Sequence, residues 1–208
     1  GFGTFILEFC RGITIFLFNN VLVRLGGNTY VAAYGILLNV SYVIICIFSG
    51  IAQSIQPIVS SNYGANMLKR AKKSFVYGFL TSVIFGILSY IFVYIFAENL
   101  SKLFTDGDIE LINITAHGMR VYFIGCMFMA FNIVTIYFFQ SVNKAKKSIL
   151  ISMSSGIVFV ILGFLILVPK LNILGVWLVF PFAEMLGFLV CIIVIFRNNL
   201  KNKEELIV

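Results

Sequence analysis

Residues 39–73, NVSYVIICIFSGIAQSIQPIVSSNYGANMLKRAKK, decide the fold class of this chain. The stretch begins as an apolar helix whose polar side chains follow one another at steps of 3, 4, 3, 4 and 3 residues. This spacing places them on one stripe of the helix: Asn39, Tyr42, Cys46, Ser49, Gln53 and Gln56. Because a membrane helix that faces only lipid has no use for such a stripe, the pattern predicts a helix that lines a polar path between other helices.

The chain around this stretch has the composition of a membrane protein. Hydrophobic residues make up 61% of it and charged residues only 11%, whereas soluble domains carry about 25% charged residues. Apolar runs of about the 20 residues that a bilayer-spanning helix needs recur along the sequence, near residues 3–24, 31–57, 74–97, 116–141, 148–168 and 174–196. We therefore predict an all-α polytopic membrane protein with six transmembrane helices in one domain over residues 1–208.

Basic residues in the connecting loops predict the orientation. Ten of the 15 lysines and arginines fall in three segments on one side of the membrane: Lys69, Arg70, Lys72, Lys73, Lys144, Lys146, Lys147, Arg197, Lys201 and Lys203. Because basic loops stay in the cytoplasm, we expect a multi-pass protein of the cytoplasmic membrane with both ends of this chain inside. The net charge of +7 is then a sign of topology, and we expect no nucleic-acid partner.

The sequence contains no catalytic motif. It has no nucleophile–base pair, no HExxH zinc motif and no glycine-rich phosphate loop, so we expect neither an enzyme nor a cofactor. The four cysteines lie singly in apolar runs without the spacing of a metal site: Cys10, Cys46, Cys126 and Cys191. The chain starts at Gly1 without a methionine, and we interpret it as a fragment or as the second half of a larger chain.

Two acidic side chains at membrane depth are candidates for a functional role. An ionisable group inside a bilayer costs a few kcal/mol, so it usually faces protein or water. In the first span, Glu8 lies close to the helical face of Arg11 and Asn19, where its carboxylate could take up a proton or hold a Na⁺ ion. The alternative is a fixed ion pair between Glu8 and Arg11, which are three residues apart.

The second candidate, Glu184, lies midway along the last span and one turn after Pro181. A proline frees a backbone carbonyl in the preceding turn, which can bend a transporter helix or supply an ion ligand. The alternative is a protonated Glu184 that hydrogen-bonds to a neighbouring helix. Asn132 in the fourth span suits either a substrate path or a bond between helices. Four further aromatic residues are expected to anchor the helices at the membrane interface: Tyr90, Tyr94, Tyr122 and Trp177.

The central stretch resembles the multidrug and toxic compound extrusion (MATE) family. The run Gly50–Ile58, continued by Asn62–Ala65 and Arg70–Lys73, is similar to the eighth helix and the following cytoplasmic loop of those transporters. Weaker marks lie on both sides of it: Glu8 before Phe18-Asn19-Asn20, Leu25-Gly26-Gly27, Ala32–Ile36, Phe139-Gln140 before Lys144–Lys147, and Gly175-Val176-Trp177 before Pro181. The likeness extends over the whole chain, which would supply helices seven to twelve, the C-terminal lobe.

The resemblance implies one lobe of a two-lobe, twelve-helix antiporter. Such a protein exports organic cations or other amphiphilic drugs and metabolites in exchange for Na⁺ or H⁺ by alternating access. In the family an acidic residue of the seventh helix takes part in cation binding, and Glu8 matches it. Some members add an aspartate in the tenth helix, where this chain departs from the pattern and has Asn132. The implied partners are the lipid bilayer, the transported molecule and the N-terminal lobe.

On this interpretation the polar stripe forms one wall of the transport cavity, and Pro57 lets the helix bend near its cytoplasmic end. We expect the cavity to be lined by Asn19, Asn39, Tyr42, Ser49, Gln53, Gln56, Asn132 and Glu184, with Glu8 as the coupling residue. Two other functions stay open. A lipid-linked oligosaccharide flippase of the same superfamily would need several basic residues in the cavity. A non-transporting membrane scaffold would bury the stripe away from water.

Overall fold

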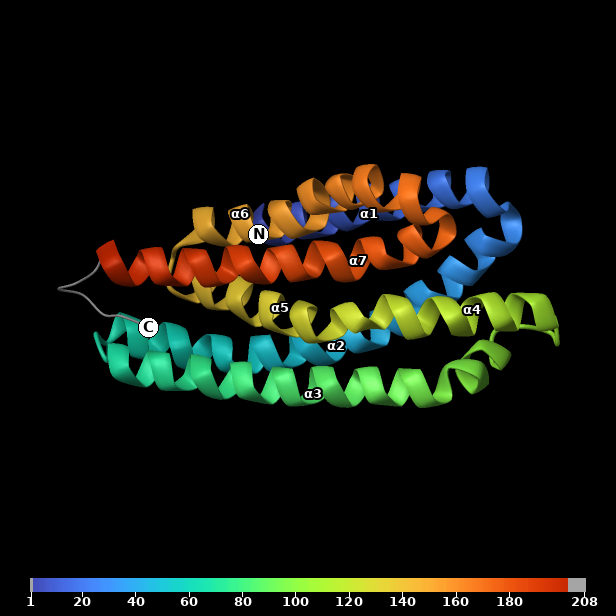
Figure 1. Ribbon diagram of the computed structural model, residues 1–208. Helices are drawn as coiled ribbons and strands as arrows, with labels where there is room; N and C mark the ends of the chain where they lie inside the picture. The colour runs from blue at the N-terminus through green and yellow to red at the C-terminus, as the bar shows by residue number, and fades with distance from the viewer. Residues whose placement is uncertain (1, 202–208) are drawn as a thin grey trace.

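The computed structural model describes residues 2–201 of the chain, and the side chains of residue 5 and residues 9–197. All regular structure in this range is helical, so the predicted all-α fold is confirmed (Figure 1). Two irregular segments interrupt the helices, a 3₁₀ turn named η1 and a π-helical segment named η2. In chain order the elements are α1 (Phe2–Gly26), α2 (Asn28–Gly64), α3 (Leu68–Lys102), α4 (Ile109–Tyr122), η1 (Phe123–Gly125), α5 (Cys126–Ser141), α6 (Ala145–Met153), η2 (Ser154–Val158) and α7 (Phe159–Lys201).

The last helix, α7, consists of two arms joined by a sharp reversal. At Asn172 the backbone leaves the helical region, with φ 49° and ψ −126°, and the chain turns back on itself (Figure 1). A Cβ atom on Gly163 in the first arm would lie 3.1 Å from Val179 in the second, and one on Gly175 would lie 2.5 Å from the carbonyl oxygen of Leu167. The two arms therefore run antiparallel in close contact.

Five helical rods of the described chain are long and apolar enough to cross a membrane. The fifth of them, residues 145–197, contains the reversal of α7 and so makes two passes. Left-handed residues with positive φ lie at the other connections, namely Gly27, Asn66, Gly107 and Asn143. Glycine and asparagine adopt this conformation at least cost, which is why the rods can be joined by short turns. Where the bilayer lies along the rods, and hence the span boundaries, stays a prediction.

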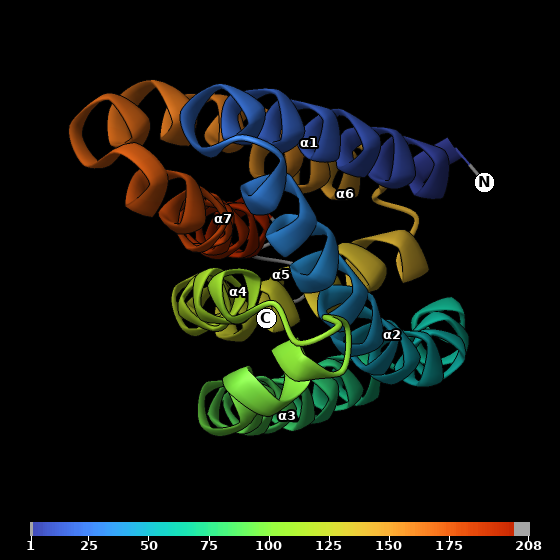
Figure 2. The ribbon, with the colours of Figure 1, turned by 90° about the vertical axis from the view of Figure 1, so that its right-hand side faces the viewer.

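The rods differ strongly in how much of their surface they bury. In the most apolar window of the α4–α5 rod 72% of the residues are buried, against 17% for α3. Figures 1 and 2 show the reason, since α4 and α5 lie inside the bundle between α3 on one edge and α1 with the first arm of α7 on the other. The exposed apolar side chains of α3, such as Ile84, Ile91 and Ile95, suit contact with lipid.

The prediction that Tyr122 and Trp177 anchor their helices at the membrane interface is wrong. Trp177 is only 1% exposed and its ring packs against Gly118 of α4, while Tyr122 is 4% exposed. Both rings fill the space between the α4–α5 rod and the second arm of α7, so neither can reach a lipid headgroup. A large aromatic side chain near a helix end serves core packing as readily as anchoring.

The hairpin inside α7 gives a first prediction. Gly175→Ala should destabilise the full-length protein by roughly 1–3 kcal/mol, because the added methyl group meets the backbone of Leu167 and Val168, which cannot give way. Thermal unfolding in detergent, followed by loss of the monodisperse peak, measures this effect. Gly12→Ala is the control, since nothing lies within 4 Å of its Cβ position. Equal stability of the two variants would contradict the close approach of the arms.

Candidate functional site

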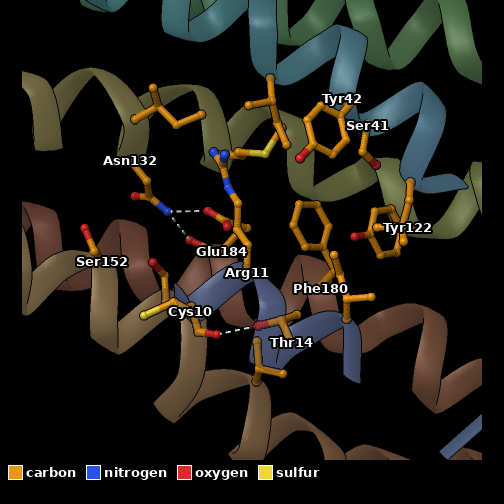
Figure 3. A pocket seen from close by; sticks show the side chains of 18 of the residues that line it. Cys10, Arg11, Thr14, Ser41, Tyr42, Tyr122, Asn132, Ser152, Phe180 and Glu184 are labelled. Atoms are coloured by element: carbon orange, nitrogen blue, oxygen red, sulfur yellow. Dashed lines mark hydrogen bonds between the residues drawn. The ribbon is translucent and has the colours of Figure 1, made fainter. Parts of the chain in front are cut away.

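A cavity opens inside the bundle between α1, α2, the α4–α5 rod and the α6–α7 arms (Figure 3). Its volume is about 140 Å³, below the roughly 300–1,000 Å³ of pockets that enclose drug-sized ligands. Most of its wall is apolar, and polar side chains from every one of these helices interrupt it: Arg11, Thr14, Ser41, Tyr42, Tyr122, Asn132, Ser152, Ser155 and Glu184. The lobe therefore carries a small, mostly apolar cavity into which polar side chains from several helices point.

A hydrogen-bonded pair across two helices forms the polar centre of the cavity. The amide nitrogen of Asn132 on α5 donates to the carboxyl Oε2 of Glu184 on α7 at 2.7 Å and to the Glu184 backbone oxygen at 3.0 Å. The thiol of Cys191 donates to the amide oxygen of Asn132 at 3.3 Å. Every polar group of Asn132 that can bond is thus engaged with α7, which fixes the side chain in place.

Two departures from α-helical geometry and one proline lie near this pair. The 3₁₀ turn η1 separates α4 from α5, the π-helical segment η2 separates α6 from α7, and Pro181 stands one turn before Glu184. A Cβ atom on Gly125 of η1 would lie only 3.1 Å from the Cα of Pro181, so two of these features touch. Irregular turns of this kind expose backbone groups and are frequent at functional sites in membrane transporters.

Glycines allow the helices to converge on Glu184. A Cβ atom on Gly187, one turn after Glu184, would lie 2.9 Å from the amide nitrogen of Asn132 and 2.7 Å from the Cβ of Ser155 in η2. On the other side of η2, the hydroxyl of Thr14 on α1 donates to the backbone oxygen of Gly156 at 2.6 Å. The π-helical segment is therefore held between α1 and α7 at the level of the acid.

Arg11 brings a positive charge to the same place. Its side chain is half-buried, lines the cavity and extends from α1 towards Asn132 and Glu184 (Figure 3). It is close enough for its charge to act on the Glu184 carboxyl. The predicted ion pair between Arg11 and Glu8 stays a prediction, because the side chain of Glu8 lies outside the described residues.

Comparison with known proteins matches this chain to one family. A model of the MatE family matches residues 3–165, more than half of the chain. The chain belongs to the MATE family. A search of curated protein sequences finds no significant match.

Solved MATE structures share the fold of this lobe. An outward-facing and an inward-facing multidrug resistance MATE transporter of the MOP superfamily each match with a TM-score of 0.87, at 19% and 17% sequence identity. A MOP superfamily transporter from Pyrococcus furiosus, described as having a binding pocket of reverse polarity, matches with the same TM-score at 19% identity. These alignments cover 93–99% of this chain but only 44–48% of the other chains, so this MATE chain spans less than half the length of its solved relatives.

Aromatic rings close one end of the cavity in this MATE lobe. Tyr122 stacks on Phe180 with 4.2 Å between ring centroids, and Phe18 stacks on Tyr34 at 4.8 Å. The rings of Tyr34 and Tyr122 meet edge to face at 6.3 Å, which joins the two stacks across α2 and α4. Three of these rings, from Tyr34, Tyr122 and Phe180, line the cavity directly, so its wall combines aromatic faces with the polar pair.

The structure divides the predicted cavity residues among several places. Tyr42, Asn132 and Glu184 line the cavity together, whereas Asn39 lines a groove between α2 and α3. Gln56 lines a separate polar pocket with Pro57 and Gln140, between the ends of α2 and α5. The remaining predicted residues line none of these three pockets, although all are half-buried or exposed: Asn19, Ser49 and Gln53. The stripe on α2 therefore enters the cavity of this lobe only at Tyr42.

Sequence reasoning missed several lining residues. Ser41 stands next to the stripe, and its hydroxyl donates to the backbone of Leu37, so it resembles ordinary helix filler in sequence. Thr14 follows Arg11 by three residues, a spacing that could have placed it on the same face. Ser152 and Ser155 belong to a run of small residues that is typical of helix packing. Nothing in this run predicts the π-helical segment.

The bond between Asn132 and Glu184 gives a second prediction. In a double-mutant cycle of Asn132→Ala and Glu184→Ala, we expect a coupling energy of about 1 kcal/mol, because interhelical hydrogen bonds in membranes contribute about 0.6 and at most about 1.7 kcal/mol. Reversible unfolding of the full-length protein in mixed micelles measures each variant. The matched control is a cycle between Asn132 and Gln53, which makes no bond to it. A coupling near zero in the first cycle would contradict the pairing.

Proposed function

We propose that this chain is the C-terminal half of a secondary-active antiporter, which exports amphiphilic molecules in exchange for a cation by alternating access. The observation that carries this proposal is the carboxyl group of Glu184 in a mostly apolar cavity inside the bundle. An acidic side chain at that depth is costly and commonly marks an ion pathway. The missing half would be an N-terminal lobe that supplies the opposite wall.

The comparison with two conformations supports the alternating-access part of the proposal. The chain matches the outward-facing and the inward-facing relative with the same TM-score of 0.87. A lobe that keeps its shape in both states can move as a rigid body against its partner, as alternating access requires. The irregular backbone around Glu184 is then a local feature of a stable lobe.

The cavity wall fits amphiphilic molecules, including organic cations. Aromatic faces of Tyr34, Tyr42, Tyr122 and Phe180 offer flat apolar surface and can attract cations through their π-electrons. The volume within this lobe is too small for a drug-sized molecule. The substrate would therefore lie between the two lobes and contact this wall on one side only.

A coupling cation, Na⁺ or H⁺, would act at Glu184, at Glu8 or at both. Glu184 contributes a carboxyl that already faces the cavity, and Glu8 is one turn from Arg11, which lines it. The protein would work in the cytoplasmic membrane with the basic connections inside. Arg11 is the one lysine or arginine among the described lining residues. An oligosaccharide flippase, which needs several such residues for pyrophosphate, is therefore the weaker alternative.

The proposal predicts the effect of removing each acid. In the full-length transporter in proteoliposomes, Glu184→Gln and Glu8→Gln should each abolish ethidium transport driven by an imposed H⁺ or Na⁺ gradient, because the amide cannot exchange a cation. Glu98→Gln is the matched control, since Glu98 is exposed and bonds to Arg120 at 3.2 Å, away from the cavity. Undiminished gradient-driven transport in both cavity variants would remove these acids from the mechanism.

Water access separates a transporter from a scaffold. With the native cysteines replaced, Tyr42→Cys and Gln53→Cys in the full-length protein should react with a charged, water-soluble thiol reagent. Tyr42 lines the cavity, and the proposal places the exposed Gln53 on the path between the two lobes. Ile95→Cys should not react, since Ile95 is 63% exposed but on the apolar outer face of α3, where lipid excludes the reagent. If neither Tyr42→Cys nor Gln53→Cys is labelled in any condition, the path carries no water and the scaffold function is favoured.

A further inference from the structure

The described hydrogen-bond partner of the Glu184 carboxyl is a donor, the side-chain amide of Asn132. Oε2 of Glu184 accepts the amide of Asn132 at 2.7 Å, and the same amide nitrogen also donates to the Glu184 backbone oxygen at 3.0 Å. A site for a metal cation needs the opposite arrangement, in which several oxygen atoms converge on the ion. The Asn132 amide thus directs its nitrogen towards the carboxyl, and this nitrogen cannot coordinate a metal cation.

The orientation of the Asn132 amide follows from its partners. A flipped amide would bring its oxygen against two acceptors, the Glu184 carboxyl oxygen and backbone oxygen, and would lose the bond that its oxygen accepts from Cys191 at 3.3 Å. Only the orientation with nitrogen towards Glu184 satisfies all three contacts. The donor character of this position is therefore a property of the packing.

Arg11 adds a full positive charge to the cavity. Its guanidinium has five N–H groups, no acceptor and a charge that persists at any physiological pH. The side chain lines the same cavity as Glu184 and acts electrostatically on its carboxyl (Figure 3). The charge of Arg11 opposes a Na⁺ ion and a proton on the carboxyl alike. A Na⁺ ion also needs space and several further oxygen ligands, whereas a proton needs only one carboxyl oxygen.

The other titratable groups near Glu184 do not change this balance. Tyr122 on α4, Cys126 on α5 and Cys191 on α7 are close enough to interact with it electrostatically, and each is a neutral donor at neutral pH. From α1 and α2, Cys10, Tyr34 and Tyr42 line the same cavity, and η2 contributes Ser155 and Gly156. Within the part of the chain whose side chains are described, no group of three or more His, Cys, Asp or Glu residues could hold a metal ion.

We infer that the cation exchanged at Glu184 is a proton and not Na⁺, with Asn132 as the positioning residue whose donor nitrogen faces the carboxyl. This inference rests on the proposed antiport function and names its coupling ion. Oε2 of Glu184 accepts the Asn132 amide, so Oε1 is the oxygen that takes up the proton. A hydronium ion in the cavity transfers its proton to Oε1, which breaks one O–H bond of the hydronium, forms one O–H bond on Glu184 and leaves a water molecule. The same O–H bond breaks when water on the opposite side of the membrane takes the proton back. The Asn132 bond persists in both states and holds the carboxyl in place.

Infrared difference spectroscopy on the full-length transporter in lipid tests the inference without any substrate. Lowering the pH at constant salt should produce the C=O band of a protonated carboxyl that is lost in Glu184→Gln and kept in Glu98→Gln. Replacing choline by Na⁺ at constant pH and ionic strength should leave the carboxylate bands of Glu184 unchanged. A Na⁺-induced change of carboxylate bands that disappears in Glu184→Gln would overturn the inference.

A second variant tests the donor argument directly and serves if Glu184→Gln does not assemble. Asn132→Asp replaces the donating nitrogen with an acceptor oxygen and sets two carboxylates side by side, so it should gain a Na⁺ response that the parent lacks. A Na⁺ response of equal size in the parent and in Asn132→Asp would overturn the inference. The proposed function is judged separately. Transport driven by a Na⁺ gradient alone would support the antiport function and contradict the proton site. Protonation of Glu184 without any gradient-driven transport would support the proton site and contradict the antiport function.

Discussion

The hydrogen bond between Asn132 and Glu184 is the constraint on which the rest of this lobe depends. A carboxyl group in the middle of an apolar bundle is stable only with a partner, and the partner must come from a neighbouring rod because the helix of Glu184 has already used its own backbone groups. Asn132 meets this need from α5, the most buried rod, and it bonds to both the side chain and the backbone of Glu184. The pair therefore fixes the register of α5 against α7 and leaves one carboxyl oxygen for chemistry in the cavity.

The other unusual features of the lobe make room for this pair. Gly187 has no side chain where a Cβ atom would strike Asn132, and η2 departs from α-helical geometry at the residues that face it. Pro181 and the η1 turn touch one turn away, at Gly125. Each of these features weakens a helix considered alone. Together they occur at one level of the bundle, and this is the level at which a transporter needs a polar chamber inside rigid walls.

Much of the fold follows from sequence patterns, because hydrophobic length and loop charge are local properties. The apolar runs predicted the helical rods. The resemblance around Gly50–Ile58 predicted the family, and the match of the family model confirms it. The site was less accessible to prediction. The stripe on α2 has the correct helical period, but period does not say which neighbour a face meets, and so Asn39 and Gln56 lie in other pockets than Tyr42. The link between Asn132 and Glu184 joins residues 52 positions apart, and the π-helical segment has no sequence signature of its own.

The central claim is that Asn132 and Glu184 are hydrogen-bonded in the intact transporter. Solid-state NMR in lipid can measure the dipolar coupling between the ¹⁵N-labelled Asn132 side chain and the ¹³C-labelled carboxyl carbon of Glu184. We predict a coupling that corresponds to direct hydrogen bonding and persists from neutral to acidic pH, since Oε2 accepts the amide whether or not Oε1 carries a proton. Absence of this coupling at every pH would show that the two helices are not joined at this point and would contradict the account.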